Sequence, residues 1–177
     1  EVSQNLLLEE KDFYKGAFPI VLKFDDLLPG EEYTVKLTLD EEKLEKEWSF
    51  FTETEENTGD VTFLLGSCAY IGKGMGKLVE PFGDNYAVYL NMLQQDADFM
   101  LWLGDNVYYL NGEYRSYKRM MNKMITVREN AEMNAFLTSM PQYAIWDDHD
   151  YGPNDGDRRW KKKEEALGVF SRFWPNP

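Results

Sequence analysis

Gln142-Tyr143-Ala144-Ile145-Trp146-Asp147-Asp148-His149-Asp150 is the stretch that decides the fold of this 177-residue chain. Residues 143–146 form a short apolar run, which is typical of a buried strand. The second half of the stretch places three carboxylates and the only histidine of the sequence directly after that strand. Packed carboxylates repel one another unless a cation, a proton or a positive side chain lies among them. The stretch therefore predicts a strand that ends at a metal site.

Two other apolar runs also end in residues that can bind metal. Residues 61–65 are followed by Gly66-Ser67-Cys68, and residues 99–103 are followed by Gly104-Asp105-Asn106-Val107-Tyr108. In an open parallel sheet, ligands bind beyond the carboxyl ends of the strands. We therefore expect the three sets of side chains to converge at one edge of a sheet.

Segments with helical spacing separate these runs. They cover residues 85–95, 114–124, 129–137 and 159–173. Strands that alternate with helices favour an α/β domain, with a parallel or mixed sheet that is covered on both faces. We assign this domain to residues 59–177.

Residues 1–58 have a different, β-like pattern. Strands are predicted at residues 20–24, 33–39 and 48–52, and the polar segment 52–60 is predicted to be a linker. The stretch from Leu27 to Tyr33 resembles the tyrosine corner of fibronectin type III-like sandwiches. Three or four strands are too few for a complete sandwich, so we expect a partial one.

Composition narrows the possible functions. Hydrophobic residues make up 43% of the chain, which is ample for a packed core. The net charge of −13 disfavours binding to nucleic acids or anionic membranes. No apolar run approaches the roughly 18 residues of a membrane span, and no signal peptide is recognisable. The lone Cys68 cannot form an intrachain disulfide, and the oligomeric state stays open.

The three strand-end motifs resemble those of the calcineurin-like metallophosphoesterases of the PhoD alkaline phosphatase type. Residues 151–155 and 173–177 fit the same branch. The resemblance implies a metallophosphatase domain behind a fibronectin-like one, and a metal-dependent hydrolase of phosphate monoesters or diesters. It also implies a secreted, periplasmic or cell-surface location. The family domain is a sandwich of two sheets, so we expect this chain to hold about half of it, with further metal ligands beyond Pro177.

The resemblance also implies roles for individual residues. Metal ligands would be the Cys68 thiolate, Asp105 as the bridging carboxylate, the Tyr108 phenolate and Asp148. His149 would be catalytic, in contact with the phosphate or the leaving group. Four further residues would support the metal ligands or line the pocket: Asp147, Asp150, Asn154 and Asp155.

The nature of the ligands indicates which metals to expect. The resemblance implies two metal ions, which Asp105 would bridge. A thiolate and a phenolate around one ion favour ferric iron over magnesium, and the second ion, bound mainly by oxygen, would be calcium, zinc, manganese or another iron. Two ions about 3.5–4 Å apart would clamp the phosphate and lower the pKa of a bound water. The resulting hydroxide would attack phosphorus in line with the departing alkoxide.

Structural roles are the alternatives for these residues. Cys68 would be a small buried side chain, Asp105 a turn or cap residue, Tyr108 a packed ring and His149 a satisfied structural histidine. At the level of the protein, the alternatives are an exported binding or scaffold protein with an inactive phosphatase-like domain, and a calcium-stabilised adhesion module.

Three other motifs are weaker. Residues 154–157 lack the spacing of an EF-hand, and residues 72–77 lack the Ser or Thr of a Walker loop. The basic residues 158–163 are more typical of a solvated helix start than of a nucleic-acid site in so acidic a chain.

Overall fold

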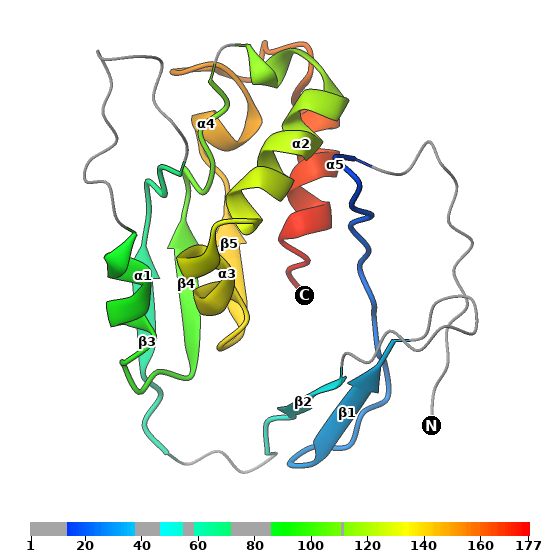
Figure 1. The fold of residues 1–177 in the computed structure, drawn as a ribbon, viewed down its shortest axis with the longest axis vertical. Coiled ribbons are helices and arrows are strands. Elements are labelled where there is room, and N and C mark those ends of the chain that lie inside the picture. The colour runs from blue at the N-terminus through cyan, green and yellow to red at the C-terminus, as the bar shows by residue number, and fades with distance from the viewer. Residues whose placement is uncertain (1–13, 38–46, 55–58, 72–85, 111) are drawn as a thin grey trace. The chain divides into compact units, whose positions relative to one another are not determined.

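The computed structural model describes residues 14–37, 47–54, 59–71, 86–110 and 112–177 (Figure 1). The chain divides into two compact units, one made of residues 1–4 and 22–60 and the other of residues 5–21 and 61–177. The glycine-rich segment 72–77 lies outside the described residues. The domain boundaries predicted from the sequence, 1–58 and 59–177, stay predictions.

The first unit contains an antiparallel pair of strands, β1 (Glu32–Lys36) and β2 (Glu47–Phe51). The Tyr33 and Phe50 rings stack across the pair at 5.8 Å. The amide of Leu28 donates a hydrogen bond to the Tyr33 hydroxyl over 2.8 Å, which is the kind of contact a tyrosine corner makes. The fibronectin-like sandwich itself stays a prediction.

The strand predicted at residues 20–24 is wrong, because the structure assigns no regular element there. A strand needs a neighbour for its backbone hydrogen bonds. Among the described residues β1 and β2 pair only with each other, and no ladder includes residues 20–24. The apolar run therefore has the composition of a strand but no partner.

The second unit is an α/β arrangement around a three-stranded parallel sheet of order β3-β4-β5. Its elements in chain order are β3 (Phe63–Gly66), α1 (Ala87–Met92), β4 (Phe99–Leu103), the 3₁₀ turn η3 (Glu113–Arg115), α2 (Tyr117–Arg128), α3 (Ala131–Leu137), β5 (Gln142–Ile145), α4 (Asp148–Tyr151) and α5 (Lys163–Phe173). The α/β class with a parallel sheet, predicted from the alternation of strands and helices, is confirmed.

One face of this sheet supplies the core. Alternate residues of the strands point under the helices, so Met100, Trp102 and Ala144 are almost fully buried. The Trp102 ring packs 5.9 Å from Phe136 of α3 and 6.4 Å from Tyr89 of α1, measured between ring centroids. Both helices therefore cover the same face of the sheet, as Figure 1 shows.

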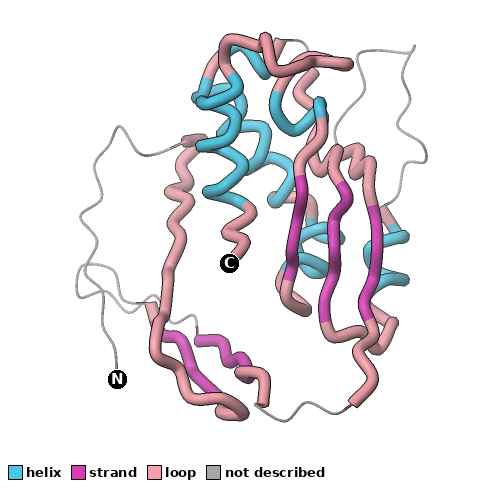
Figure 2. The backbone as a smooth tube through the Cα atoms, turned by 180° about the vertical axis from the view of Figure 1, so that it is seen from behind, coloured by secondary structure: helices cyan, strands magenta, loops and turns pink. Residues whose placement is uncertain are grey.

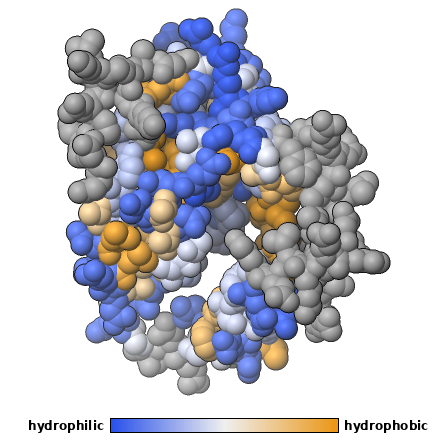
Figure 3. Space-filling model, viewed as in Figure 1, coloured by the Kyte–Doolittle hydropathy of each residue, from blue (hydrophilic) through white to orange (hydrophobic). Residues whose placement is uncertain are grey.

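The outer side of α1 carries two exposed apolar side chains. This short helix buries Tyr89 and exposes Val88 and Leu90, at 57% and 43% of their surface. Figure 3 shows the resulting apolar group among hydrophilic neighbours. Two isolated exposed side chains on a helix are ordinary for a protein surface and indicate no site by themselves.

The other face of the sheet carries a continuous apolar surface, which we call the open face. Its members come from all three strands: Phe63, Leu65, Phe99, Leu101, Leu103, Tyr143 and Ile145. Figure 2 shows the strands from this side with no described helix in front of them. The expectation that both faces are covered is therefore wrong for the described part of the chain, since α1 and α3 lie on one side.

Two details of the C-terminal half were not predicted correctly. The final helix begins at Lys163 rather than Arg159, and residues 148–151 form the short helix α4.

Asn176 lies beside β5. Its side-chain oxygen accepts a hydrogen bond from the amide of Ala144, and its side-chain nitrogen donates one to the carbonyl of Ala144. This pairing satisfies backbone groups on the outer edge of the strand.

Among the described residues, no helix has the length and apolar character to cross a membrane.

Candidate metal centre

The end of β5 delivers two candidate ligands on consecutive residues. Asp147 is the N-cap of α4, and its carboxylate accepts the amide of Asp148 over 2.9 Å. The Asp150 side chain accepts the amide of Asp147 in return, which completes a capping box. This reciprocal cap starts the helix immediately after the strand. It therefore fixes Asp148 and His149 in the first turn of α4.

The end of β4 delivers Asp105 through an unusual backbone. Gly104 has φ +98° and Asp105 has φ +54°, both in the left-handed region. Such a conformation costs a non-glycine residue on the order of 1–3 kcal/mol and is concentrated at functional sites. A Cβ atom on Gly104 would lie 2.7 Å from the Cβ of Asp147. The glycine is thus needed for the ends of β4 and β5 to approach each other.

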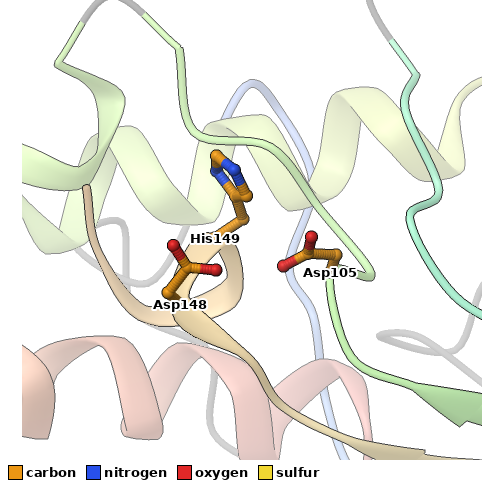
Figure 4. A group of neighbouring side chains, drawn as sticks. All are labelled: Asp105, Asp148 and His149. Atoms are coloured by element: carbon orange, nitrogen blue, oxygen red, sulfur yellow. The ribbon is translucent and has the colours of Figure 1, made fainter. Parts of the chain in front are cut away.

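Asp105, Asp148 and His149 form a cluster of potential metal ligands. One ligand atom from each lies within 4.8 Å of the others. Figure 4 shows the two carboxylates facing each other, Asp105 from the loop after β4 and Asp148 from the start of α4. The structure therefore brings together residues that are more than 40 positions apart in the sequence, as parallel strands with a common edge predict.

The cluster lacks a protein cation. No lysine or arginine of the described segments forms an ion pair with Asp105 or Asp148. The Oδ1 atom of Asp105 is buried and has no hydrogen-bond partner. A buried carboxylate oxygen without a partner is costly, and a bound cation would remove that cost. The residues present therefore fit a metal ion.

Cys68 and Tyr108 adjoin the cluster through Asp105. The Cys68 sulfur lies 3.6 Å and the Tyr108 hydroxyl 3.0 Å from the Oδ2 atom of Asp105. Cys68 also has a left-handed backbone, with φ +58°. Its amide donates to the carbonyl of Gly104, and the amide of Ala69 donates to that of Asp105. These bonds hold the ends of β3 and β4 together, so that all three strand ends meet.

The protonation of Tyr108 depends on whether a cation is present. Burial raises the pKa of its phenol well above the usual value, and the hydrogen bonds with Cys68 and Asp105 raise it further. Without a metal ion the group therefore stays a phenol that donates to Asp105. A bound cation would reverse this preference, because it stabilises a phenolate directly.

His149 packs against Tyr108 in the same site. Their ring centroids lie 4.2 Å apart, and the Tyr70 ring lies 5.2 Å from Tyr108 on another side. The histidine is half-buried. The contact places an imidazole beside the candidate phenolate ligand and the two carboxylates.

Asp150 connects the two strand ends rather than facing the cluster. Its side chain is almost fully buried and accepts the amide of Asn106 over 2.9 Å in addition to that of Asp147. Burial raises the pKa of this carboxyl to about 7, although the backbone hydrogen bonds lower it in part. Asp150 thus acts as a strap between the loop after β4 and the start of α4.

Asn154 and Asp155 are exposed and lie beside Asp148. The Asn154 amide donates to the carboxylate of Asp155, and the backbone amide of Asp155 donates to the Oδ2 atom of Asp148. This loop therefore contacts the cluster through its backbone, and it orients one candidate ligand.

Sequence reasoning overlooked Asn106. Its side chain is buried and donates to the carbonyl of Ile145 over 2.7 Å, while its Oδ1 atom has no partner. Its position in the sequence could have indicated this role. A polar residue directly after a Gly-Asp pair at a strand end can form side-chain hydrogen bonds with backbone groups of the neighbouring strand.

Comparisons with known proteins support the fold. No family model matches the chain, and no curated protein is significantly similar. The solved structure of PhoD is similar over 85% of this chain, with a TM-score of 0.61 and 19% sequence identity. The chain spans 32% of the length of that structure. The chain therefore has a PhoD-like fold, which agrees with the resemblance of its motifs.

Proposed function

We propose that this chain is part of a metal-dependent phosphoric ester hydrolase that acts on phosphate monoesters or diesters. The observation that carries the proposal is the Asp105–Asp148–His149 cluster at the carboxyl ends of three parallel strands. The buried, unpartnered oxygen of Asp105 adds a specific reason to expect a cation. The PhoD-like fold supports the class of reaction.

Asp105, Asp148, Cys68 and Tyr108 would hold the metal. A thiol and a phenol next to shared carboxylates favour iron, with calcium, zinc or manganese as the second ion. Bound cations supply positive charge for the phosphoryl oxygens and lower the pKa of water. Without them, a site lined by carboxylates would repel the phosphate of the substrate.

The proposed role of His149 is proton transfer or hydrogen bonding to the phosphate ester. An imidazole can stabilise charge that develops on the phosphoryl oxygens, or protonate the departing alkoxide. Tyr108 supports its ring by the contact described above. Asp150, Asp147 and the 154–155 loop would position the ligands, as their hydrogen bonds to the cluster segments suggest. A location outside the cytoplasm is part of the proposal and rests on the motif resemblance alone.

The test is Asp105→Asn in the intact protein. We expect loss of bound metal and at least about 100-fold lower hydrolysis of aryl phosphate mono- and diesters, since an amide is a much weaker ligand than a bridging carboxylate. Elemental analysis and steady-state kinetics measure the two effects. The matched control is Asp98→Asn, an exposed aspartate that accepts the amide of Thr62 at the other end of β4. Full activity in the Asp105 variant would contradict the proposal.

A further inference from the structure

A pocket of about 450 Å³ adjoins the candidate metal centre. Asp148 lines this pocket and also belongs to the ligand cluster, so the two sites share a wall. The start of α5 and the segment before it also line the pocket, with Arg158, Lys163 and Leu167. An ester bound at the metal centre through its phosphate therefore has room for its alcohol group in this pocket.

Part of the pocket wall consists of exposed apolar side chains. Trp146 and Leu167 line it and remain exposed, at 39% and 40% of their surface. The Trp146 ring is held in place by Tyr151 and Phe170, with ring centroids 5.4 and 6.0 Å away. A fixed indole beside an exposed leucine is a surface on which a flat apolar group can stack.

The charge that is free to meet a ligand is positive. The carboxylate of Asp147 is occupied as a helix cap, and Asp148 belongs to the proposed metal ligands. The remaining charged side chains of the pocket are the cations of Arg158 and Lys163 and the anion of Glu164, which together carry one net positive charge. Within the described residues the Arg158 guanidinium has no acidic partner, whereas the neighbouring Arg159 is paired with Asp157 at 2.8 Å. The Lys163 ammonium donates to the backbone carbonyl of Arg158, and both residues line the pocket.

We infer that this pocket binds the alcohol part of the substrate and selects phosphate esters whose alcohol has a flat, apolar ring with an anionic substituent. The apolar part would stack on Trp146, and the anionic substituent would pair with Arg158 and Lys163. A guanidinium can bind such a group through two hydrogen bonds, which gives it the larger share of the selectivity. The inference rests on the proposed function, since it places the reacting phosphate at Asp105 and Asp148.

The test compares 4-carboxyphenyl phosphate with its 4-carboxamide isostere on the intact protein. The two esters have the same shape and differ in one negative charge. We expect the carboxylate ester to have about tenfold higher kcat/KM, and Arg158→Gln to bring this ratio close to one. The matched control is Arg159→Gln, which should keep the ratio because Arg159 is paired and does not line the pocket. Equal kcat/KM values in the unmodified protein, or an equal loss for both esters in Arg158→Gln, would overturn the inference.

Calorimetric titration of the same two compounds separates this inference from the proposed function. If neither ester is hydrolysed, the proposed function fails, but binding still reports on the pocket. The carboxylate compound should bind about tenfold more tightly, and this difference should disappear in Arg158→Gln. Equal dissociation constants for the two compounds would reject the pocket assignment independently of turnover.

Discussion

Gly104 shows how much one residue contributes to the candidate centre. Its positive φ turns the chain sharply after β4, and its missing side chain leaves room for the Cβ of Asp147. Both effects are needed to bring Asp105 within reach of Asp148. A residue with no functional group therefore controls the separation of two candidate ligands.

We predict that Gly104→Ala lowers the free energy of unfolding by about 2 kcal/mol or more, because the new Cβ adds a steric clash to an unfavourable φ. Urea denaturation of the intact protein measures the change. Gly168→Ala is the matched control. Gly168 lies inside α5, and a Cβ there would meet only Tyr117 at 3.8 Å, so alanine should raise stability by about 0.5–1 kcal/mol. Equal effects of the two substitutions would contradict the role given to Gly104.

At the scale of elements, the site depends on the link between the loop after β4 and the first turn of α4. Asp150 makes this link, since its two oxygens accept one backbone amide from each segment. The side chain of Asn106 adds a bond to the end of β5. These two side chains connect the strand ends, so Asp105 and Asp148 keep their relative positions.

We predict that Asp150→Asn destabilises the protein by about 1–3 kcal/mol. Asparagine has the same shape but one acceptor oxygen, so its amide group would face a buried backbone N–H. Thermal or urea unfolding measures the loss, and metal affinity should fall about 10–100-fold in the same variant because the ligand segments lose their strap. The control Asp98→Asn should stay within about 0.5 kcal/mol, since Asp98 is exposed. A stable Asp150 variant with unchanged metal affinity would show that the strap is dispensable.

At the scale of the molecule, the open face is a sheet surface of the second unit that no described helix covers. Its seven side chains are aliphatic or aromatic, and Phe99 packs between Phe63 and Tyr143 with centroids 5.1 and 5.6 Å away. Parallel sheets are normally buried on both sides. We therefore expect further protein to cover the open face in the intact molecule.

We predict that Leu65→Lys on the open face lowers the free energy of unfolding of the intact protein by about 2–4 kcal/mol, because it would bury an unpaired charge. Leu90→Lys on α1 is the control. The two leucine side chains are exposed to similar degrees in this structure, at 56% for Leu65 and 43% for Leu90. We expect Leu90 to stay in contact with solvent in the intact protein, so its substitution should change stability little. Urea denaturation of both variants decides the point. If Leu65→Lys is as mild as its control, the open face is a solvent-exposed surface.

The sequence predicted where the three parallel strands lie along the chain, because a short apolar run followed by glycine or acidic residues is a local signal. Residues 99–103 match β4 in full, and the runs at 61–65 and 143–146 differ from β3 and β5 by one or two residues. The short helix α4 was missed, since four residues carry no helical period and its capping box depends on side chains already assigned to chemistry. The strand at residues 20–24 was wrong because strand formation requires a partner that composition does not reveal.

The sequence by itself determined which residues could carry chemistry: three strand-end sets that contain Cys68, Asp105, Tyr108, Asp148 and His149. It did so because parallel strands with a common direction place their carboxyl ends at one edge. Only the tertiary structure decided which of them meet, through the clearance at Gly104 and the strap at Asp150. It also decided that Arg158 lines a pocket while Arg159 does not. Distances between segments depend on packing and backbone hydrogen bonds, and neither can be read from residue spacing along the chain.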